Sequence, residues 1–169
     1  MTELNAETFD LDAWISGAER TVRSAIVYQK ANLIAELDIL AERIGNAERE
    51  EAVDGPSMGG GSGKLRAEYA RLADEFKKSA LTVRMKALTF DEKKEIEKAH
   101  KKDAGLHALS ASMVEPKCTP EQIEKLEAAI GNAQMGLIIR AYNRACDDAP
   151  SVSADFLPKS SGQESSDES

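Results

Sequence analysis

Aromatic residues are scarce in this chain. Phe, Trp and Tyr together make up 5% of its 169 residues, whereas 41% of the residues are hydrophobic. A core with so few rings must be mostly aliphatic and rich in alanine, which favours helices over a β-sandwich. The length suits one domain that can bury a core, with room for an appendage.

Cysteines and long apolar runs are also few. Cys118 and Cys146 stand alone without Cys-x-x-Cys spacing, which argues against a disulfide framework. No stretch approaches the roughly 18 apolar residues of a membrane span, and the acidic start of the chain lacks a signal-peptide pattern. We therefore expect a soluble cytosolic protein with reduced thiols and no membrane partner.

The chain has no excess of positive charge. Lys and Arg number 22 against 30 Asp and Glu, so the formal net charge is −8. Nucleic-acid affinity depends on cations that neutralise phosphates. The lysines between 93 and 102 alternate with acidic residues, which is typical of a solvated helix face. Nucleic acid is not an expected partner.

The glycine-rich stretch 54–63 does not fit a phosphate-binding loop. The pattern G-x-x-x-x-G-K-[ST] would need glycine at Met58, a hydroxyl at Leu65 and a preceding strand, but the preceding residues have helical periodicity. Its composition is that of a flexible linker.

The other chemistry-bearing residues are dispersed. His100 and His107 are seven residues apart, and no Cys or acidic residue stands at a convincing metal-ligand spacing. Cys118 precedes a predicted helix, which could activate its thiol slightly, but no base is placed beside it. We therefore expect no catalytic residue, no cofactor site and no metal site, and we do not expect an enzyme.

Two segments have strand patterns. Residues 21–28 contain several β-branched and aromatic residues, and residues 81–87 alternate cleanly, with Leu81, Val83, Met85 and Ala87 on one face. Because a lone strand leaves its backbone groups unpaired, we expect the two to form a two-stranded antiparallel element.

Between these strands the sequence predicts a helical hairpin. Apolar residues recur at heptad-like spacing in two segments, namely Leu33, Leu37, Leu40, Ile44 and Ala47, and then Leu65, Tyr69, Leu72 and Phe76. Such narrow seams favour packing of one helix against another. With the chain reversing at 54–63, we expect an antiparallel coiled-coil finger about 30 Å long.

The region after the strands predicts a helical body. Thr89 to Glu92 and Thr119 to Gln122 match capping boxes that start helices. Pro116 should end an apolar helix over 106–114. Gly131 is a plausible helix stop before a last helix with an apolar stripe.

Together these patterns predict a mostly α fold of the α+β class, with a helical C-terminal bundle, a small two-stranded sheet and the finger. We divide the chain into an N-terminal segment (1–20), the strands with the finger (21–88), the helical body (89–149) and a disordered, Ser-rich acidic tail (150–169). Trp14, the only tryptophan, is either a peg that covers the edge of the core or an exposed anchor for a partner.

Candidate partner-binding residues are the apolar residues of these helices. Met113 and Met135 are candidates because methionine suits adaptable surfaces, although core filling is the alternative. The full set is Trp14, Leu37, Leu40, Ile44, Tyr69, Leu72, Phe76, Met113, Met135, Ile138 and Tyr142.

Several short motifs resemble one family. They are Phe9-Asp-Leu-Asp-Ala-Trp14, the passage 81–89, His100, Met113-Val-Glu-Pro-Lys117 leading into Thr119-Pro-Glu-Gln122, the terminal helix with Tyr142-Asn143, and Leu157-Pro-Lys159 in the tail. In this order they resemble the tail assembly chaperones of long, non-contractile-tailed bacteriophages, over most of the chain.

The resemblance implies an accessory protein of the infected host's cytoplasm. It would bind the tape measure protein and keep it soluble while tail tube protein polymerises around it, and would be absent from the finished virion. Such families commonly make a longer form by programmed frameshift, which an extendable tail accommodates.

Two alternatives stay open. The protein could instead be a minor tail or tail completion protein of the virion, or a generic coiled-coil adaptor. A homo-oligomer is compatible with each of these roles.

Overall fold

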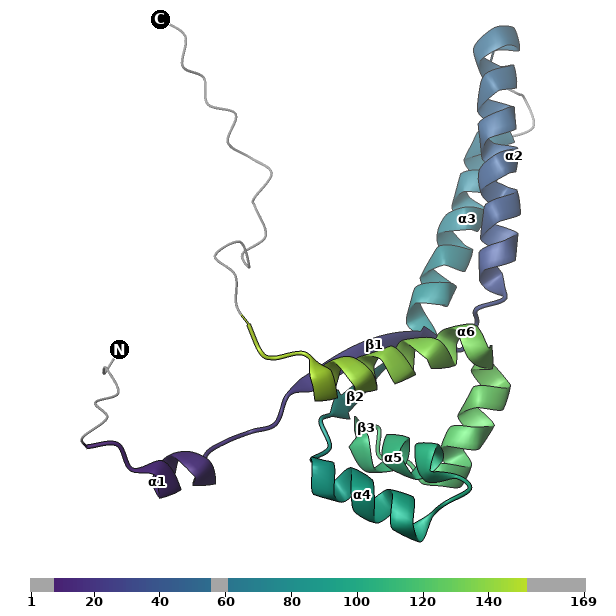
Figure 1. Cartoon of the computed structure of the whole chain (residues 1–169). Helices are drawn as coiled ribbons and strands as arrows, with labels where there is room; N and C mark the ends of the chain where they lie inside the picture. The colour runs from purple at the N-terminus through teal and green to yellow at the C-terminus, as the bar shows by residue number, and fades with distance from the viewer. Residues whose placement is uncertain (1–7, 56–60, 152–169) are drawn as a thin grey trace, which may run out of the picture.

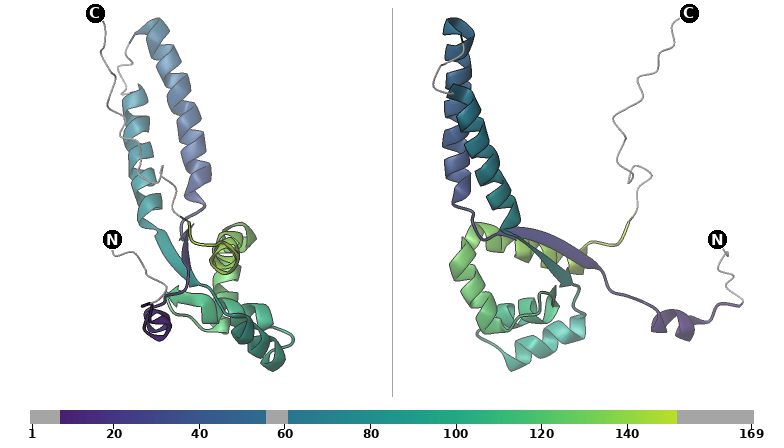
Figure 2. Two further views of the ribbon diagram at one scale, coloured as in Figure 1. Left: turned by 60° about the vertical axis from the view of Figure 1, so that its left-hand side comes forward. Right: turned by 180° about the vertical axis from the view of Figure 1, so that it is seen from behind.

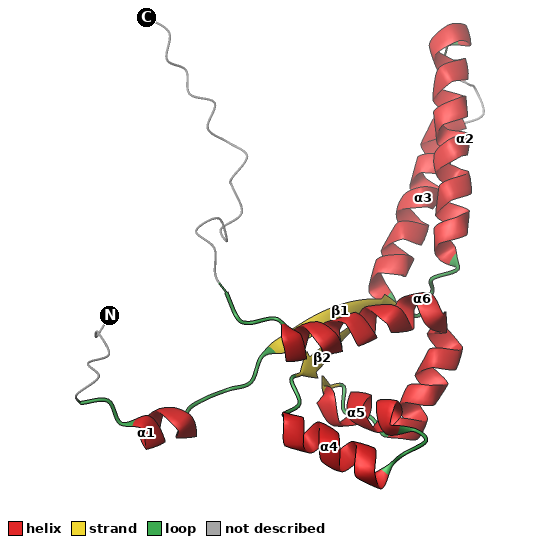
Figure 3. Cartoon of the chain, viewed as in Figure 1, coloured by secondary structure: helices red, strands yellow, loops and turns green. Residues whose placement is uncertain are grey.

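The computed structural model describes residues 8–55 and 61–151. It is mostly helical with a small antiparallel sheet, which confirms the predicted fold class (Figures 1 and 3). The first five elements are α1 (Leu11–Ser16), β1 (Val22–Tyr28), α2 (Leu33–Asp54), α3 (Gly61–Lys78) and β2 (Ala80–Lys86). They are followed by α4 (Phe90–Ala99), α5 (Ala104–Ser112), β3 (Met113–Glu115) and α6 (Pro120–Asp147).

The two predicted strands pair as expected. β1 and β2 are antiparallel over seven residues, from Val22 opposite Lys86 to Tyr28 opposite Ala80. Val27, Val83 and Met85 are buried on the face that the alternation assigns to the core, whereas Leu81 at the start of β2 is exposed.

The sheet also has a third strand that was not predicted. β3 pairs with β2, so the order is β1-β2-β3. The expected helix over 106–114 therefore ends at Ser112, two residues early. The Ser112 hydroxyl donates to the Lys86 carbonyl at 2.6 Å, and Met113 pairs with Met85. Bonding to the sheet replaces the last helical turn.

The core lies between the sheet and the helices α5 and α6. Its buried members come from both layers, and the cluster is Ala25, Val27, Val83, Met85, Leu109, Met113, Ile123, Met135, Ile138 and Ala141. Alanine and aliphatic side chains dominate it, as the scarcity of aromatic residues predicts.

α6 bends at Gly131, where φ is 78° and ψ is 166°. This backbone conformation suits glycine because it has no Cβ. The predicted helix stop at Gly131 is thereby confirmed. The bend lets the first part of α6 run beside α5 while the second part lies along β1 (Figure 1).

The Gln134 side chain hydrogen-bonds the free edge of β1. Its side-chain carbonyl accepts from the Tyr28 backbone N–H at 2.7 Å, and its amide donates to the Tyr28 carbonyl at 3.0 Å. A side-chain amide thus takes the place of a neighbouring strand and pairs backbone groups at the edge of the sheet.

The finger forms as predicted and projects away from the body (Figure 2). α2 and α3 pack through a separate small core of Leu33, Leu37, Leu40 and Leu72. At its root, the rings of Tyr28 and Phe76 stack with centroids 4.1 Å apart. Lys30 also pairs with Glu75. The finger is therefore held to β1 by both apolar and charged contacts.

The loop at the tip of the finger is shorter than the predicted linker 54–63. α2 continues to Asp54 and α3 starts at Gly61, while residues 56–60 lie outside the described residues. The Glu51 carboxylate accepts from the Ser62 N–H at 2.9 Å and from its hydroxyl at 2.7 Å, and these bonds lower the pKa of Glu51. The Glu51 carboxylate thus pairs an N–H of the first helical turn that has no partner within the helix, which explains why α3 can begin among glycines.

Both predicted capping boxes are present. Thr89 and Glu92 exchange backbone and side-chain bonds at the start of α4, and Thr119 and Gln122 do the same at the start of α6. Glu92 also accepts from Arg20 at 2.6 Å. The Arg20 guanidinium and then the Thr89 N–H lower the pKa of Glu92 to about 2. This ion pair links the N-terminal arm to α4.

We expect Glu92→Gln to lose this ion pair but keep the cap, because Gln122 performs the same capping role. The pair is 40% exposed on each side, so the cost at pH 7 is about 0.5–1 kcal/mol. Since the folded pKa lies below the unfolded value, the contribution is present above about pH 4.5 and is lost as pH falls toward 2. Urea unfolding at several pH values measures the difference.

An Arg20→Ala background provides the control for this prediction. There the Glu92→Gln substitution should have a smaller effect on stability, and the pH dependence should shrink to the part that the Thr89 hydrogen bonds contribute. A pH-dependent difference that is undiminished without Arg20 would mean that Arg20 is not the main cause of the low pKa of Glu92.

Candidate partner-binding groove

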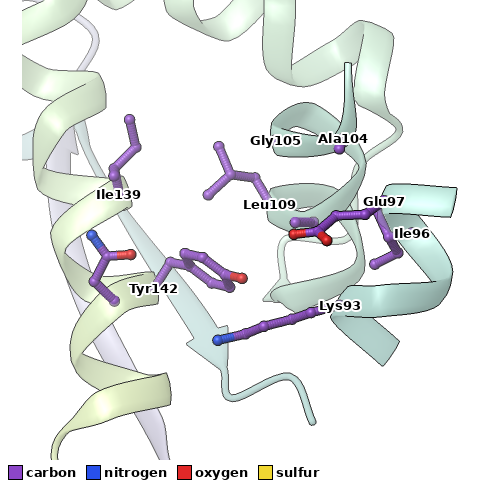
Figure 4. A pocket seen from close by; sticks show the side chains of 10 residues that line it. Lys93, Ile96, Glu97, Ala104, Gly105, Leu109, Ile139 and Tyr142 are labelled. Atoms are coloured by element: carbon purple, nitrogen blue, oxygen red, sulfur yellow. The ribbon is translucent and has the colours of Figure 1, made fainter. Parts of the chain in front are cut away.

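A cleft of about 350 Å³ opens between α4, α5 and α6 (Figure 4). Its walls come from segments far apart in the chain. α4 contributes Lys93, Ile96 and Glu97, α5 contributes Ala104, Gly105, Ala108 and Leu109, and α6 contributes Ile139, Tyr142 and Asn143. We call this cleft the body groove.

Small residues on α5 create the space of the body groove. Ala108 is four residues after Ala104 and three residues after Gly105. All three therefore lie on the same surface of the helix. A β-carbon added at Gly105 would meet no atom within 4 Å. Ile96 and Ile139 provide apolar walls, and Ile139 is 40% exposed.

Tyr142 contributes a phenol hydroxyl to the lining of the groove. Its side chain reaches from α6 toward Lys93 and Glu97 (Figure 4). Burial, followed by the neighbouring Cys146, raises the pKa of Tyr142 to about 12. The phenol therefore stays protonated near neutral pH and can donate a hydrogen bond. Lys93 Nζ lies 5.7 Å from the centre of the ring, a cation–π arrangement.

Most of the predicted partner-binding residues instead contribute to the two cores. In the folded conformation a partner cannot reach them, because their side chains are already covered. These residues are Leu37, Leu40, Leu72, Met113, Met135 and Ile138. Ile44 and Phe76 are half-buried in the finger.

Three predicted residues remain accessible, but they are not brought together. Tyr142 lines the body groove, and Tyr69 is 38% exposed on α3 of the finger. Trp14 is 56% exposed on α1, which has no buried residue and stands apart from the body (Figure 1). The peg interpretation of Trp14 is therefore wrong.

α1 presents an apolar cluster to solvent. Trp14 lies beside Phe9, with ring centroids 6.5 Å apart, and Leu11 and Ile15 are exposed on the same short helix. The Asp10 side chain accepts from the Ala13 N–H at 3.1 Å and caps the helix. The cluster is thus a preformed but uncovered apolar surface.

Sequence reasoning overlooked Ile96, Ile139 and the small residues of α5. A signal existed in Leu137-Ile138-Ile139, because three consecutive apolar residues cannot all face the same side of a helix. Ile138 is fully buried, so its neighbours must point elsewhere.

Cys118 is not an activated thiol. It is partly buried, and this burial raises the pKa of the thiol. Its Sγ lies 3.1 Å from Met113 Sδ, in contact with the core. The thiol is thus packed as a small apolar group.

The two histidines are close together, contrary to the expectation that they are dispersed. His100, Asp103 and His107 place one ligand atom each within 4.8 Å of one another at the junction of α4 and α5. Asp103, the residue before α5, completes the cluster.

Comparisons of the chain with protein-family models, curated proteins and solved structures find no match. Within residues 8–55 and 61–151, no helix has the length and apolar character required to cross a bilayer.

Proposed function

We propose that this protein is a phage tail assembly chaperone that binds helical segments of the tape measure protein and keeps them soluble. The observation that supports this proposal best is the body groove, an open cleft with a floor of small residues between three helices. The family resemblance of the sequence supplies the identity of the partner.

The body groove suits the apolar face of a helix. Ala104, Gly105 and Ala108 permit close approach, and Ile96 and Ile139 cover apolar side chains from either side. Lys93 and Glu97 stand among the lining residues, where they can contact polar groups on the partner. Helix-in-groove binding uses this combination of an apolar floor and a polar rim.

The finger and the net charge serve solubility in this proposal. The exterior of the finger has several ion pairs, including Arg66 with Glu48 and Lys78 with Asp74. A formal charge of −8 makes complexes repel one another. An aggregation-prone helix that occupies the groove would therefore be covered by an acidic, well-solvated protein.

α1 provides a second contact in the same proposal. Trp14 and its apolar neighbours are on an arm that leaves the body before β1 (Figure 2). Exposed Trp is a frequent hot spot of protein interfaces. The arm thus offers a second apolar surface to the partner.

Co-expression with the tape measure protein of the same phage tests the proposal. We expect the tape measure protein to shift from the pellet to the soluble fraction and to co-purify with this chain. If it stays equally insoluble with and without this chain, the proposal is wrong. Mass spectrometry of purified virions distinguishes a chaperone, which should be missing, from a minor tail or tail completion protein.

A coiled-coil adaptor is the second candidate, because α2 exposes apolar residues outside its seam. Ile34, Ile39 and Val53 are 44%, 59% and 83% exposed. If they mediate pairing of fingers, light scattering of the purified protein will give the mass of a dimer. Ile39→Lys would then return it to a monomer.

A further inference from the structure

The junction of α4 and α5 brings three ligand-type side chains together. His100 caps the end of α4, with its N–H bonded to the Ile96 carbonyl at 2.8 Å. Asp103 precedes the first residue of α5, and the His107 N–H bonds to the Asp103 carbonyl at 3.2 Å. Residues four apart on a helix lie on the same side, so Asp103 and His107 are neighbours.

The side chains of this cluster converge. The imidazole rings of His100 and His107 are stacked, with centroids 3.4 Å apart and planes 8° from parallel. His107 Nε2 lies 3.4 Å from the Asp103 carboxylate. One ligand atom from each of the three residues lies within 4.8 Å of the other two.

We propose that His100, Asp103 and His107 bind a divalent transition metal ion, for which Zn²⁺ is the probe. Two imidazole nitrogens and one carboxylate oxygen are a common zinc ligand set, with water in the fourth position. Zinc bonds are about 2.0–2.2 Å long, so tetrahedral ligand atoms stand roughly 3.3 Å apart.

To reach this geometry the two stacked rings must tilt away from parallel, because each imidazole nitrogen binds a metal ion in the plane of its own ring. Asp103 is exposed, and both histidines are only half-buried, so none of the three is fixed by core packing. The negative charge of Asp103 favours a cation. The positive charges of Lys101 and Lys102 in the same turn disfavour cation binding, but both side chains are exposed to solvent, which screens their charge.

A metal ion here would fix the angle between α4 and α5. His100 belongs to the end of α4, whereas His107 is on α5, so coordination joins the two helices. Ala104, Gly105 and Ala108 of α5 line the body groove opposite Ile96 of α4. The ion would therefore set the width of the groove, but its binding does not depend on the proposed chaperone function.

Zinc titration of the full-length chain without an affinity tag tests this inference. His100 and His107 are the only histidines, so every imidazole signal in a long-range ¹H–¹⁵N NMR spectrum reports on the site. We expect one Zn²⁺ per chain by calorimetry and shifts of both imidazoles at the same stoichiometry. A Cys118→Ala/Cys146→Ala background removes thiol binding as a competing explanation.

Three substitutions sharpen this test. Asp103→Asn, which keeps the shape of the side chain, and His107→Gln should each weaken zinc binding at least about tenfold, because loss of a ligand costs no less than loss of the outer-shell partner of a ligand. Asp91→Asn in the first turn of α4 is the matched control and should bind like the wild type. Circular dichroism verifies that each variant is folded.

Two results would overturn the inference. The first is a wild-type NMR spectrum in which the imidazole signals do not move at millimolar Zn²⁺. The second is zinc binding that Asp103→Asn and His107→Gln leave unchanged. Either result would mean that the stacked rings are packing alone.

Discussion

Replacing Ile138 with alanine is expected to destabilise the protein by about 2–5 kcal/mol, the largest effect of any single truncation considered. Ile138 is fully buried on α6, in the core between the helices and the sheet. Alanine would leave a cavity among side chains from β1, β2 and α5, which cannot collapse around it without moving the sheet. Urea unfolding followed by circular dichroism measures the loss.

The adjacent residue supplies the matched control. Ile139 is 40% exposed and lines the body groove, so Ile139→Ala removes the same atoms from a partly solvated site. It should change the free energy of unfolding by no more than about 0.5 kcal/mol. Equal losses from both substitutions would contradict the orientation of α6 and, with it, the position of the groove.

The elements that the sequence predicts well are those fixed by local chemistry. Thr89 and Thr119 begin helices because their hydroxyls accept from N–H groups three residues ahead. Gly131 interrupts a helix because it alone adopts positive φ at low cost. The apolar seams of α2 and α3 likewise predict that the two helices pair, since Leu37 and Leu72 can be buried only against a partner helix.

The elements that the sequence predicts poorly depend on contacts between residues far apart in the chain. β3 exists because Ser112 and Met113 meet β2, some 26 residues earlier in the chain. Trp14 has an apolar neighbourhood in the sequence, but whether that neighbourhood packs on the core depends on the path of residues 17–21. No local rule specifies that path.

Most of the predicted partner-binding residues lie in the two cores for a physical reason. The strongest apolar periodicity marks the positions that the fold itself buries, so seams and stripes select core residues such as Leu40 and Met135. A groove is instead formed by small side chains and by apolar residues beside the stripe. Ala108 and Ile139 have that character, and their sequence signal is weak.

A charge placed in the body groove is expected to weaken strongly the proposed interaction with the tape measure protein while the fold stays intact. In Ile139→Glu, a carboxylate replaces an apolar wall residue that is already partly exposed. The free protein can solvate this charge, but a bound helix would bury it unpaired. We expect binding to weaken at least about thirtyfold, the loss typical of a hot-spot residue.

Leu137→Glu is the matched control for this charge. Leu137 is 37% exposed on the same helix but does not line the groove. Both variants add one negative charge to α6, so general effects on solubility and net charge cancel between them. Co-purification of the tape measure protein should fail with Ile139→Glu and persist with Leu137→Glu. If both variants retain the partner, the groove is not its binding surface, and the exposed cluster around Trp14 becomes the next surface to test.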